Sequence, residues 1–442
     1  MIPLRLHRAC WPLPPLLLAL PSLAITLLTA YATADQLSLT APDWTHTSGL
    51  IADGMRLPTV VAAAAAGLIA CRLTPRTRIF AQTWQSRTGW PSVWRQAVPA
   101  LGWFLGAYLL GLVPLLWRTA QGAGHGGPDL LVVGGVLVEF AAVVALGYLV
   151  GAAIANPLAV PAAAGVALLT LYLPGALGAW SGFTPAVVAD RPYLGMREER
   201  PFAAFRLGMS AFVLIVAAVL ADRLMRGGRS WSAASYGPAA VLLAVAVALI
   251  PPYPAWGWVE YAPDKPQLCQ DDPAVRVCVH QGHAAYLTDT TKRAAALVGA
   301  YGAEAVDFTE IRDLSLARSH ADVLVGEREG VLWLRIRPGW DAERDVAATL
   351  TRRLVPDTAV ACGSEGVARL DPEAEPEQRR AAVLVELGAW LEGDASGGAE
   401  GGPSEDSLFG AASEDEVRAW IGEARGSIAA CQVDPEDLPW RL

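Results

Sequence analysis

The chain has 442 residues, of which 53% are hydrophobic and 17% are charged, whereas about a quarter of the residues in an ordinary soluble protein are charged. Residues 1–253 hold 16 Arg, no Lys and 9 acidic residues, and residues 254–442 hold 18 basic and 34 acidic residues. The apolar first part excludes a fold that is solvated on all sides, and the acidic second part argues against nucleic acid as a partner.

These two parts predict two domains, a transmembrane helical domain over residues 1–253 and an extracytoplasmic α/β domain over residues 254–442. A hydrocarbon core of roughly 30 Å requires about 20 apolar residues in a helix. The fold class expected is therefore an α-helical polytopic membrane bundle of seven spans followed by a small α/β domain. The predicted spans are Trp11–Thr33, Met55–Cys71, Ala97–Trp117, Leu130–Ala155, Pro157–Leu177, Ala204–Ala221 and Ala234–Pro252.

The first span has an alternative interpretation. Arg5 and Arg8, a Leu-rich stretch and the small residues 32–34 also fit a cleavable signal peptide. The length of the apolar stretch, and the prolines that interrupt it, favour a retained span. Either interpretation leaves the sidedness of the later segments unchanged.

Arg-rich loops predict the orientation, because short loops with excess Arg stay on the cytoplasmic side. The N-terminus and the loops after the second and sixth spans carry this excess, whereas the loop after the first span is acidic. With seven spans, the N-terminus is expected in the cytoplasm and the C-terminal domain outside the cell membrane. The cytoplasmic residues are Arg5, Arg8, Arg72, Arg76, Arg78, Arg87, Arg95, Arg223, Arg226 and Arg229.

The segment Phe80–Gln96, between the second and third spans, carries alternating aromatic and cationic residues. This pattern predicts a helix lying in the membrane interface, and simple anchoring by a Trp belt is the alternative. The residues concerned are Trp84, Arg87, Trp90, Trp94 and Arg95.

Glu139 lies inside the fourth predicted span. An ionised group there costs at least a few kcal/mol and is a functional candidate by default. A proton or substrate relay is one interpretation, and a protonated or hydrogen-bonded residue facing the bundle interior is the other.

Two pairs of small residues occur at four-residue spacing, Gly102 with Gly106 and Gly147 with Gly151. Such spacing permits close contact between helices. It is compatible with packing inside the chain or with the seam of a dimer.

The C-terminal domain shows short β-branched runs and longer helical patterns. Ser413 with Glu416 forms a capping-box pattern before the last helix, and the Gly-, Ser- and acid-rich stretch Gly393–Ser407 predicts a mobile loop. Strands are expected at Val275–His280 and Val331–Arg337, and helices at Ala284–Tyr301, Asp341–Leu354, Glu375–Leu391 and Glu414–Ala430.

Four cysteines lie in the part predicted to be outside, Cys269, Cys278, Cys362 and Cys431. An even number in an oxidising compartment predicts disulfides. Three pairings are open, and Cys269 with Cys278 and Cys362 with Cys431 is the favoured one. Free buried thiols are the alternative.

The sequence Cys278-Val-His280-Gln-Gly-His283 resembles a metal-binding cluster. It lacks the three or four ligands that zinc sites need, so an ordinary strand-to-helix junction is expected and no metal or other cofactor. The chain also lacks a Gly-x-x-x-x-Gly-Lys-Ser/Thr phosphate-binding loop. ATP hydrolysis through that motif would need another chain.

The cytoplasmic N-terminus, the short amphipathic element at Phe80–Gln96 and the low-charge helices resemble the permease subunit of ABC-2 class exporters. Residues 277–280, 419–421 and 430–431 are similar to the outer domains of actinobacterial permease-like proteins, in keeping with the scarcity of Lys. The resemblance implies that Phe80–Gln96 is the element that couples to a separate ABC ATPase.

The function expected is therefore that of the transmembrane subunit of an ABC-type exporter, in the bilayer, as a homodimer or heterodimer, with no catalytic residue of its own. A membrane-anchored sensor or binding protein that acts through its outer domain is the alternative. A membrane-bound hydrolase is less favoured, because catalytic motifs are missing.

Overall fold

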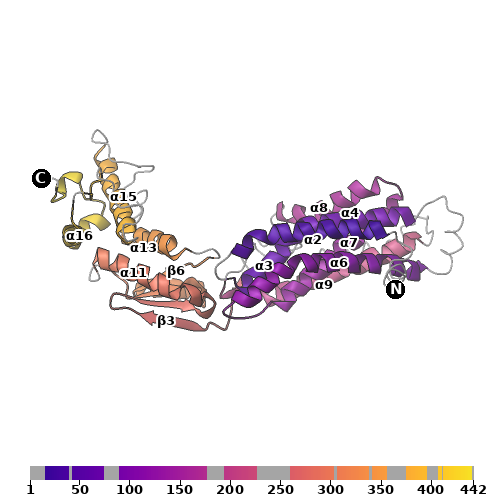
Figure 1. Ribbon diagram of the computed structural model, residues 1–442, viewed down its shortest axis with the longest axis horizontal. Helices are drawn as coiled ribbons and strands as arrows, with labels where there is room; N and C mark the ends of the chain where they lie inside the picture. Colours follow the sequence, from indigo (N-terminus) through magenta and orange to yellow (C-terminus); the bar gives the residue numbers. More distant parts are fainter. Residues whose placement is uncertain are drawn as a thin grey trace. The chain divides into compact units, whose positions relative to one another are not determined.

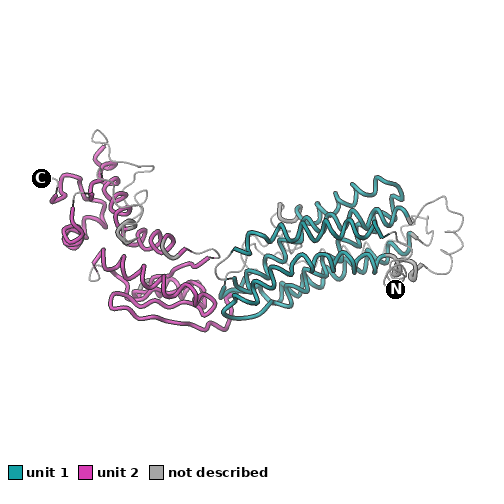
Figure 2. The backbone as a smooth tube through the Cα atoms, viewed as in Figure 1, with its two compact units in different colours: residues 1–260 teal, residues 261–442 magenta. Residues whose placement is uncertain are grey.

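The structure is a computed structural model that describes residues 15–38, 42–73, 89–176, 194–225, 259–302, 306–337, 341–355, 375–395, 407–410 and 412–440. The chain forms two compact units, Met1–Glu260 and Tyr261–Leu442 (Figure 2). Unit 1 is a helical bundle, and unit 2 contains a four-stranded sheet with helices.

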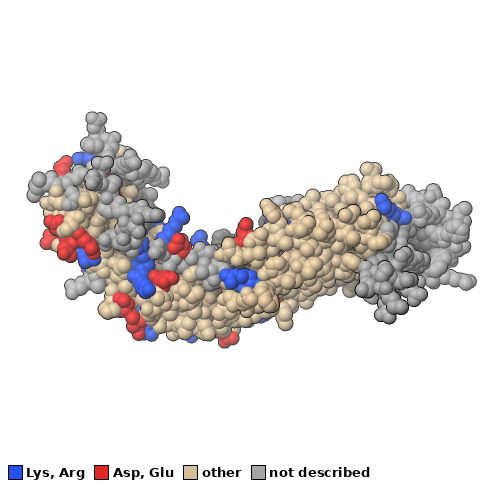
Figure 3. Space-filling view, viewed as in Figure 1, with Lys and Arg blue, Asp and Glu red and all other residues tan. Residues whose placement is uncertain are grey.

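The helices of unit 1 run along a common direction (Figure 1). Their bounds are α2 Pro15–Thr33, α3 Trp44–Gly54, α4 Arg56–Leu73, α6 Gly89–Gly122, α7 Leu130–Ile154, α8 Ala159–Ala176 and α9 Arg200–Met225. A short 3-10 helix, η1, covers Ala34–Ser38. Along the middle of the bundle the face shown in Figure 3 is almost entirely uncharged. Such a surface fits a hydrocarbon surrounding.

Among the described residues, five helical stretches are long and apolar enough to cross a membrane. They are Pro15–Ser38, Trp44–Arg72, Ala97–Gly122, Leu130–Ile154 and Arg200–Leu224. The sequence predicted seven spans. The fifth corresponds to α8, Ala159–Ala176, whose apolar stretch among the described residues is Ala159–Tyr172. The seventh, Ala234–Pro252, lies outside the described residues, as do residues 11–14 of the first.

The second span is longer than predicted, because α3 continues into α4 through Met55. Asp43 caps α3, since its Oδ1 accepts a hydrogen bond from the backbone N–H of His46 at 2.7 Å. Asp53 and Arg56 lie on either side of the junction between α3 and α4. In the structure they form an ion pair of 3.1 Å one turn apart, so neither charge has to end the helix.

The centre of the bundle is closed by direct contact between α4 and α7. A Cβ atom added at Gly147 would lie 2.3 Å from the carbonyl oxygen of Ala63, and one added at Gly151 would lie 2.3 Å from that of Gly67. No side chain larger than hydrogen fits at this spacing. The pair Gly147 and Gly151 therefore packs against another helix of the same chain. Of the two interpretations given for its spacing, packing inside the chain is the one that the structure shows for this pair.

Unit 2 is built on a sheet with the strand order β3-β4-β5-β6. The strands are Gln267–Asp271, Arg276–His280, Glu310–Asp313 and Val331–Leu334, and the helices are α11 Leu287–Tyr301, α12 His320–Arg328, α13 Ala347–Leu354, α15 Pro376–Ala395 and α16 Glu414–Ala429. β3 pairs antiparallel with β4, and β4, β5 and β6 are parallel. A two-stranded sheet pairs β1, Met196–Glu198, with β2, Val259–Tyr261.

The predicted strands and helices of unit 2 correspond to elements of the structure, with shifted ends. The capping box of α16 is confirmed, because the Glu416 carboxylate accepts from the Ser413 N–H at 2.8 Å. The expected helix at Asp341–Leu354 begins as a π-helical turn, Ala342–Val346. β3, β5 and α12 were not predicted, because the polar and charged residues within them hide the apolar period.

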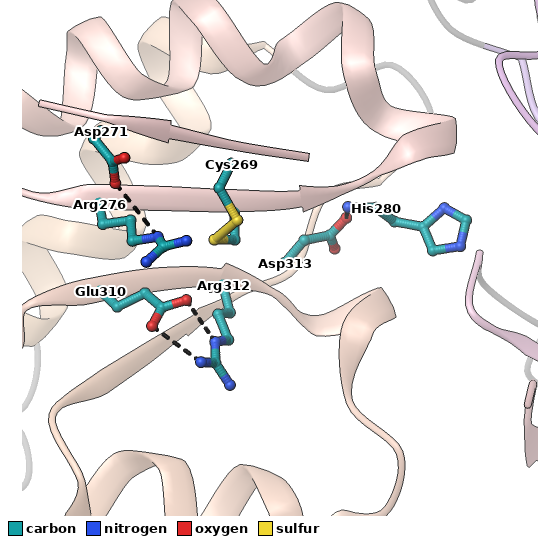
Figure 4. The surroundings of a disulfide bond; sticks show 8 residues. Cys269, Asp271, Arg276, His280, Glu310, Arg312 and Asp313 are labelled. Carbon is teal, nitrogen blue, oxygen red and sulfur yellow. Dashed lines mark hydrogen bonds and ion pairs between the residues drawn. A yellow bond between two sulfur atoms is a disulfide. The ribbon is translucent and has the colours of Figure 1, made fainter. Parts of the chain in front are cut away.

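Successive side chains of the sheet point to opposite faces. Val277, Val279 and Ile311 are buried on one face. On the other, Cys269 and Cys278 lie directly opposite each other and form a disulfide with a Cα–Cα distance of 4.1 Å (Figure 4). This confirms the first favoured pair. Cys431 is also disulfide-bonded, but Cys362 lies outside the described residues, so the second pair stays a prediction.

Candidate functional site

Three charged side chains are buried together in unit 1. Glu139 on α7 is 4% exposed, Arg206 on α9 is 4% exposed, and Glu198 at the end of β1 is 5% exposed. Arg206 Nη1 lies 2.7 Å from Glu198 Oε1. Glu139 lies within electrostatic range of the same guanidinium. We call these three residues the buried charge cluster.

Local structure brings the cluster together. β1 ends at Glu198, only two residues before α9 begins at Arg200, so the carboxylate can lie against the second turn of α9. Arg200 Nη1 contacts both carboxylate oxygens of Asp129 at 2.9 and 3.1 Å. Asp129 also caps α7, because its Oδ1 accepts from the N–H groups of Leu131 and Val132. The starts of α7 and α9 are thereby held side by side.

The polar atoms of the cluster are incompletely satisfied. Among the described residues, Glu139 Oε2, Glu198 Oε1 and the Nε and Nη1 of Arg206 have no hydrogen-bond partner. The contact of Arg206 with Glu198 is therefore a close ion pair that lacks hydrogen-bond alignment. Burial raises the pKa of Glu198 above its usual range, and the positive charge of Arg206 opposes this shift. The unsatisfied carboxyl oxygens can accept hydrogen bonds, and the unsatisfied nitrogens of Arg206 can donate them.

Arg206 was not singled out from the sequence, although it lies within the predicted sixth span, Ala204–Ala221. The signal that selected Glu139, an ionisable residue within an apolar run, applies equally to Arg206. Glu198 lies outside every predicted span, so only its contact with Arg206 reveals it.

The predicted coupling residues are only partly described. Trp84 and Arg87 lie outside the described residues. Trp90, Trp94 and Arg95 lie in the first turns of α6, which runs unbroken from Gly89 to Gly122. This part of the segment is continuous with the third span, which corrects the prediction of a separate interfacial helix over all of Phe80–Gln96. Pro91, Pro99 and Pro114 occur within this helix, and none of them ends it.

A second polar cluster lies in unit 2, where the parallel strands β4 and β5 end. The carboxylate of Asp313, 2% exposed, accepts three hydrogen bonds. His283 Nδ1 lies 2.6 Å from its Oδ2, the backbone N–H of His280 lies 3.2 Å from the same oxygen, and the N–H of Ser315 lies 3.0 Å from Oδ1. Figure 4 shows the Asp313 carboxylate beside the His280 backbone.

This arrangement agrees with the expected strand-to-helix junction at the metal-like sequence. Cys278 is used by the disulfide, His280 Nδ1 accepts from the N–H of Gly282 at 3.0 Å, and His283 is directed to Asp313. Among the residues whose placement is described, no group of three or more His, Cys, Asp or Glu could hold a metal ion.

Electrostatics stabilise the charged form of Asp313. Burial alone would raise its pKa. The hydrogen bond and charge of His283, together with hydrogen bonds from Ser315, outweigh burial, and the pKa of Asp313 lies below its usual value.

Nearby, Lys265 Nζ donates to the carbonyl oxygens of Ser315, at 2.9 Å, and Ala317. Burial lowers the pKa of Lys265 to about 8, against the opposing effect of Asp313.

We expect replacement of Asp313 by Asn to destabilise β4 and β5 by about 2 kcal/mol, because its amide nitrogen cannot accept a hydrogen bond, so the buried N–H of either His280 or Ser315 would lose its acceptor. Hydrogen exchange of the β5 amides in the full-length protein measures this loss.

Since the pKa of Asp313 is depressed in the folded state, its contribution to the free energy of unfolding is present at neutral pH and is lost as the pH falls below about 4. The difference between the two proteins should shrink in that range.

Asp271→Asn is the matched control, because the Asp271 side chain lies in the same sheet but is 80% exposed. Its effect should stay below about 0.5 kcal/mol. Equal protection of β5 in both variants would contradict the role assigned to Asp313.

The described residues thus contain two polar clusters, one within the apolar bundle and one at the edge of the sheet. Each is assembled from segments that lie far apart in the sequence. Comparisons of the chain with protein-family models, with curated proteins and with solved structures found no match.

Proposed function

We propose that this protein is the transmembrane permease subunit of an ABC-type exporter and that a separate ATPase chain energises it. In this proposal the chain lies in the cell membrane with its N-terminus in the cytoplasm and unit 2 outside. The observation that carries the proposal is the continuity of α6 from Gly89 through the apolar stretch Ala97–Gly122.

The length of α6 exceeds what a span requires. Its 34 residues make a helix of about 51 Å, whereas the hydrocarbon core is roughly 30 Å thick. The turns before Ala97 therefore lie beyond the apolar stretch, next to the Arg-rich segment. Because the helix is unbroken, a push on these turns by a partner protein would move the span itself.

The buried charge cluster supports a path for cargo through the bundle. Ionisable groups inside membrane helices commonly mark the route of a substrate or ion. Glu139 and Arg206 lie on the adjacent helices α7 and α9. A relative movement of these helices would change the pairing of the cluster, and the unpaired Glu139 Oε2 could receive a polar group of the cargo.

A specific observation also favours the alternative, a membrane-anchored sensor or binding protein. Unit 2 has its own buried residues, its own disulfide and the Asp313 cluster at the carboxyl ends of parallel strands. Ligands often bind at that edge of α/β sheets. A sensor would need no ATPase, and this difference separates the two proposals.

The test is co-purification of the full-length protein with the ABC ATPase encoded nearest to it. Replacing Arg87 by Glu should abolish co-purification, because losing a paired charge at a protein interface typically costs 2 kcal/mol or more. Membrane insertion should be unchanged, since four other Arg remain in residues 72–95.

Arg229→Glu provides the control, because it makes the same change of charge in the other predicted cytoplasmic loop. It should leave the ATPase bound. If no ATPase co-purifies with the native chain, or if Arg87→Glu retains it at the native level, the exporter proposal fails and the sensor proposal replaces it.

A further inference from the structure

The charges of the buried charge cluster do not balance when all three of its groups are ionised. Glu139 and Glu198 would each carry a negative charge and Arg206 one positive charge, so one negative charge would be left over. The three residues are 4–5% exposed, and water therefore screens this excess poorly. An unbalanced charge in such a place is costly, and a buried acid takes up a proton instead.

The elements packed against α7 and β1 do not supply the missing positive charge. Asp53 of α3 and Arg56 of α4 form an ion pair with each other, and α8 contains no acidic or basic residue. Asp129 and Arg200, whose fields reach Glu198, are likewise paired at 2.9 Å. The other ionisable residues of these elements whose side chains are described are His46, Cys71, Arg72, Tyr108, Arg118, Tyr148, Tyr172, Arg197, Asp222 and Arg223.

Only one of the two acids is paired with Arg206, the cation whose field reaches both. Arg206 Nη1 lies 2.7 Å from Glu198 Oε1, so Glu198 is the ionised acid. Glu139 Oε2 has no hydrogen-bond partner among the described residues, and nothing there stabilises a negative charge on this oxygen. A neutral carboxyl group costs far less in such a site than a charged one, so the extra proton belongs on Glu139.

We propose that the buried charge cluster binds one proton, which lies on whichever carboxyl group is not paired with Arg206. In the structure this group is Glu139. Arg206 Nε has no hydrogen-bond partner among the described residues, so the guanidinium retains a donor for a second carboxylate.

Movement of Arg206 from Glu198 to Glu139 would transfer the proton. The O–H bond of Glu139 would break and leave its electron pair on the oxygen, and an O–H bond would form on Glu198. The cluster would hold one proton and no net charge before and after the step. Because Glu139 lies on α7 and Arg206 on α9, a relative movement of these helices is linked to the position of the proton.

The geometry favours a proton over a metal ion as the ligand. A metal ion needs several oxygen ligands at once, whereas a proton needs one. Among the described residues no group of three or more His, Cys, Asp or Glu could hold a metal ion. The proposal goes beyond the exporter function and does not require it, because a sensor could use the same proton.

Infrared spectra of the purified full-length protein test the proposal by counting protonated carboxyl groups. The C=O stretch of a protonated carboxyl is separate from that of a carboxylate, and it shifts when heavy water replaces the proton by a deuteron. At about pH 7 ordinary Asp and Glu side chains are ionised, so they do not contribute. In a detergent without carbonyl groups, we expect such a band from the native protein.

Charge balance predicts how each variant changes the band. Glu139→Gln and Glu198→Gln should both remove it, since each leaves one acid and one cation, which need no proton. Arg206→Gln should double it, since both acids must then be neutral. Asp35→Asn is the control, because Asp35 is an exposed carboxyl of unit 1, and it should leave the band unchanged.

Glu198→Gln is the sharpest of these variants, because it leaves Glu139 in place. A band that persists in folded Glu198→Gln would show that Glu139 is neutral whatever Arg206 pairs with, and the proposal would fail. It would also fail if the native protein gave no band, or if the band survived in Glu139→Gln. A native band that disappears when sodium chloride replaces choline chloride at constant pH would assign the site to a metal ion. None of these measurements involves an ATPase, so their outcome is separate from that of the exporter proposal.

Discussion

Replacement of Arg206 by alanine is expected to cost the bundle roughly 3–5 kcal/mol, because it leaves the buried Glu198 carboxylate without its cation. The Arg206 side chain is 4% exposed, so water cannot take its place. The free energy of unfolding of the purified full-length protein in detergent, measured by titration with a denaturing detergent, reports this loss.

Two further variants show whether the loss of stability in Arg206→Ala comes from the charge or from the volume of the side chain. Arg223→Ala removes an Arg from the exposed side of the last turn of α9 and should cost less than about 1 kcal/mol. Combining Arg206→Met with Glu198→Gln and Glu139→Gln removes the charges but keeps similar volumes, and it should recover much of the stability. If Arg206→Ala behaved like Arg223→Ala, the cluster would have no structural role.

Replacement of Gly151 by leucine is expected to separate α4 from α7. The Cβ alone would lie 2.3 Å from the carbonyl oxygen of Gly67 and 2.8 Å from the Cβ of Ala70. Overpacking usually costs about 1–3 kcal/mol where side chains can move, and here the obstacle is backbone. We therefore expect at least about 3 kcal/mol of destabilisation and a low yield of folded protein, measured by size-exclusion chromatography and detergent unfolding.

Gly134→Leu is the control on the same helix, because no described atom lies within 4 Å of its added Cβ. Leucine also has a better helix propensity than glycine, by about 0.8 kcal/mol, so this variant should be as stable as the native protein or slightly more so. Similar yields for the two variants would contradict the close contact at Gly151.

The sequence by itself was sufficient to predict the apolar helices, because a segment in hydrocarbon must satisfy its own backbone and can do so over about 20 apolar residues. The existence of a helical bundle and of a mixed α/β unit could be predicted from the composition and from the spacing of apolar residues. The ends of the helices could not be predicted, since they depend on local pairs such as Asp53 with Arg56. An isolated charge in a sequence does not show whether it is neutralised.

Pairings between distant residues were decided only by the tertiary structure. The sequence favoured Cys269 with Cys278 but left three pairings open, and the register of β3 on β4 places these two cysteines directly opposite each other. Glu139 was evident as a charge in a span, whereas its neighbour Arg206 lies two helices later in the chain. The two glycine pairs share one spacing, and only packing determined that one contacts α4 while the other has no described atom close to it. Local patterns determine which elements form, but side-chain partners depend on which elements become neighbours, and that is a property of the whole fold.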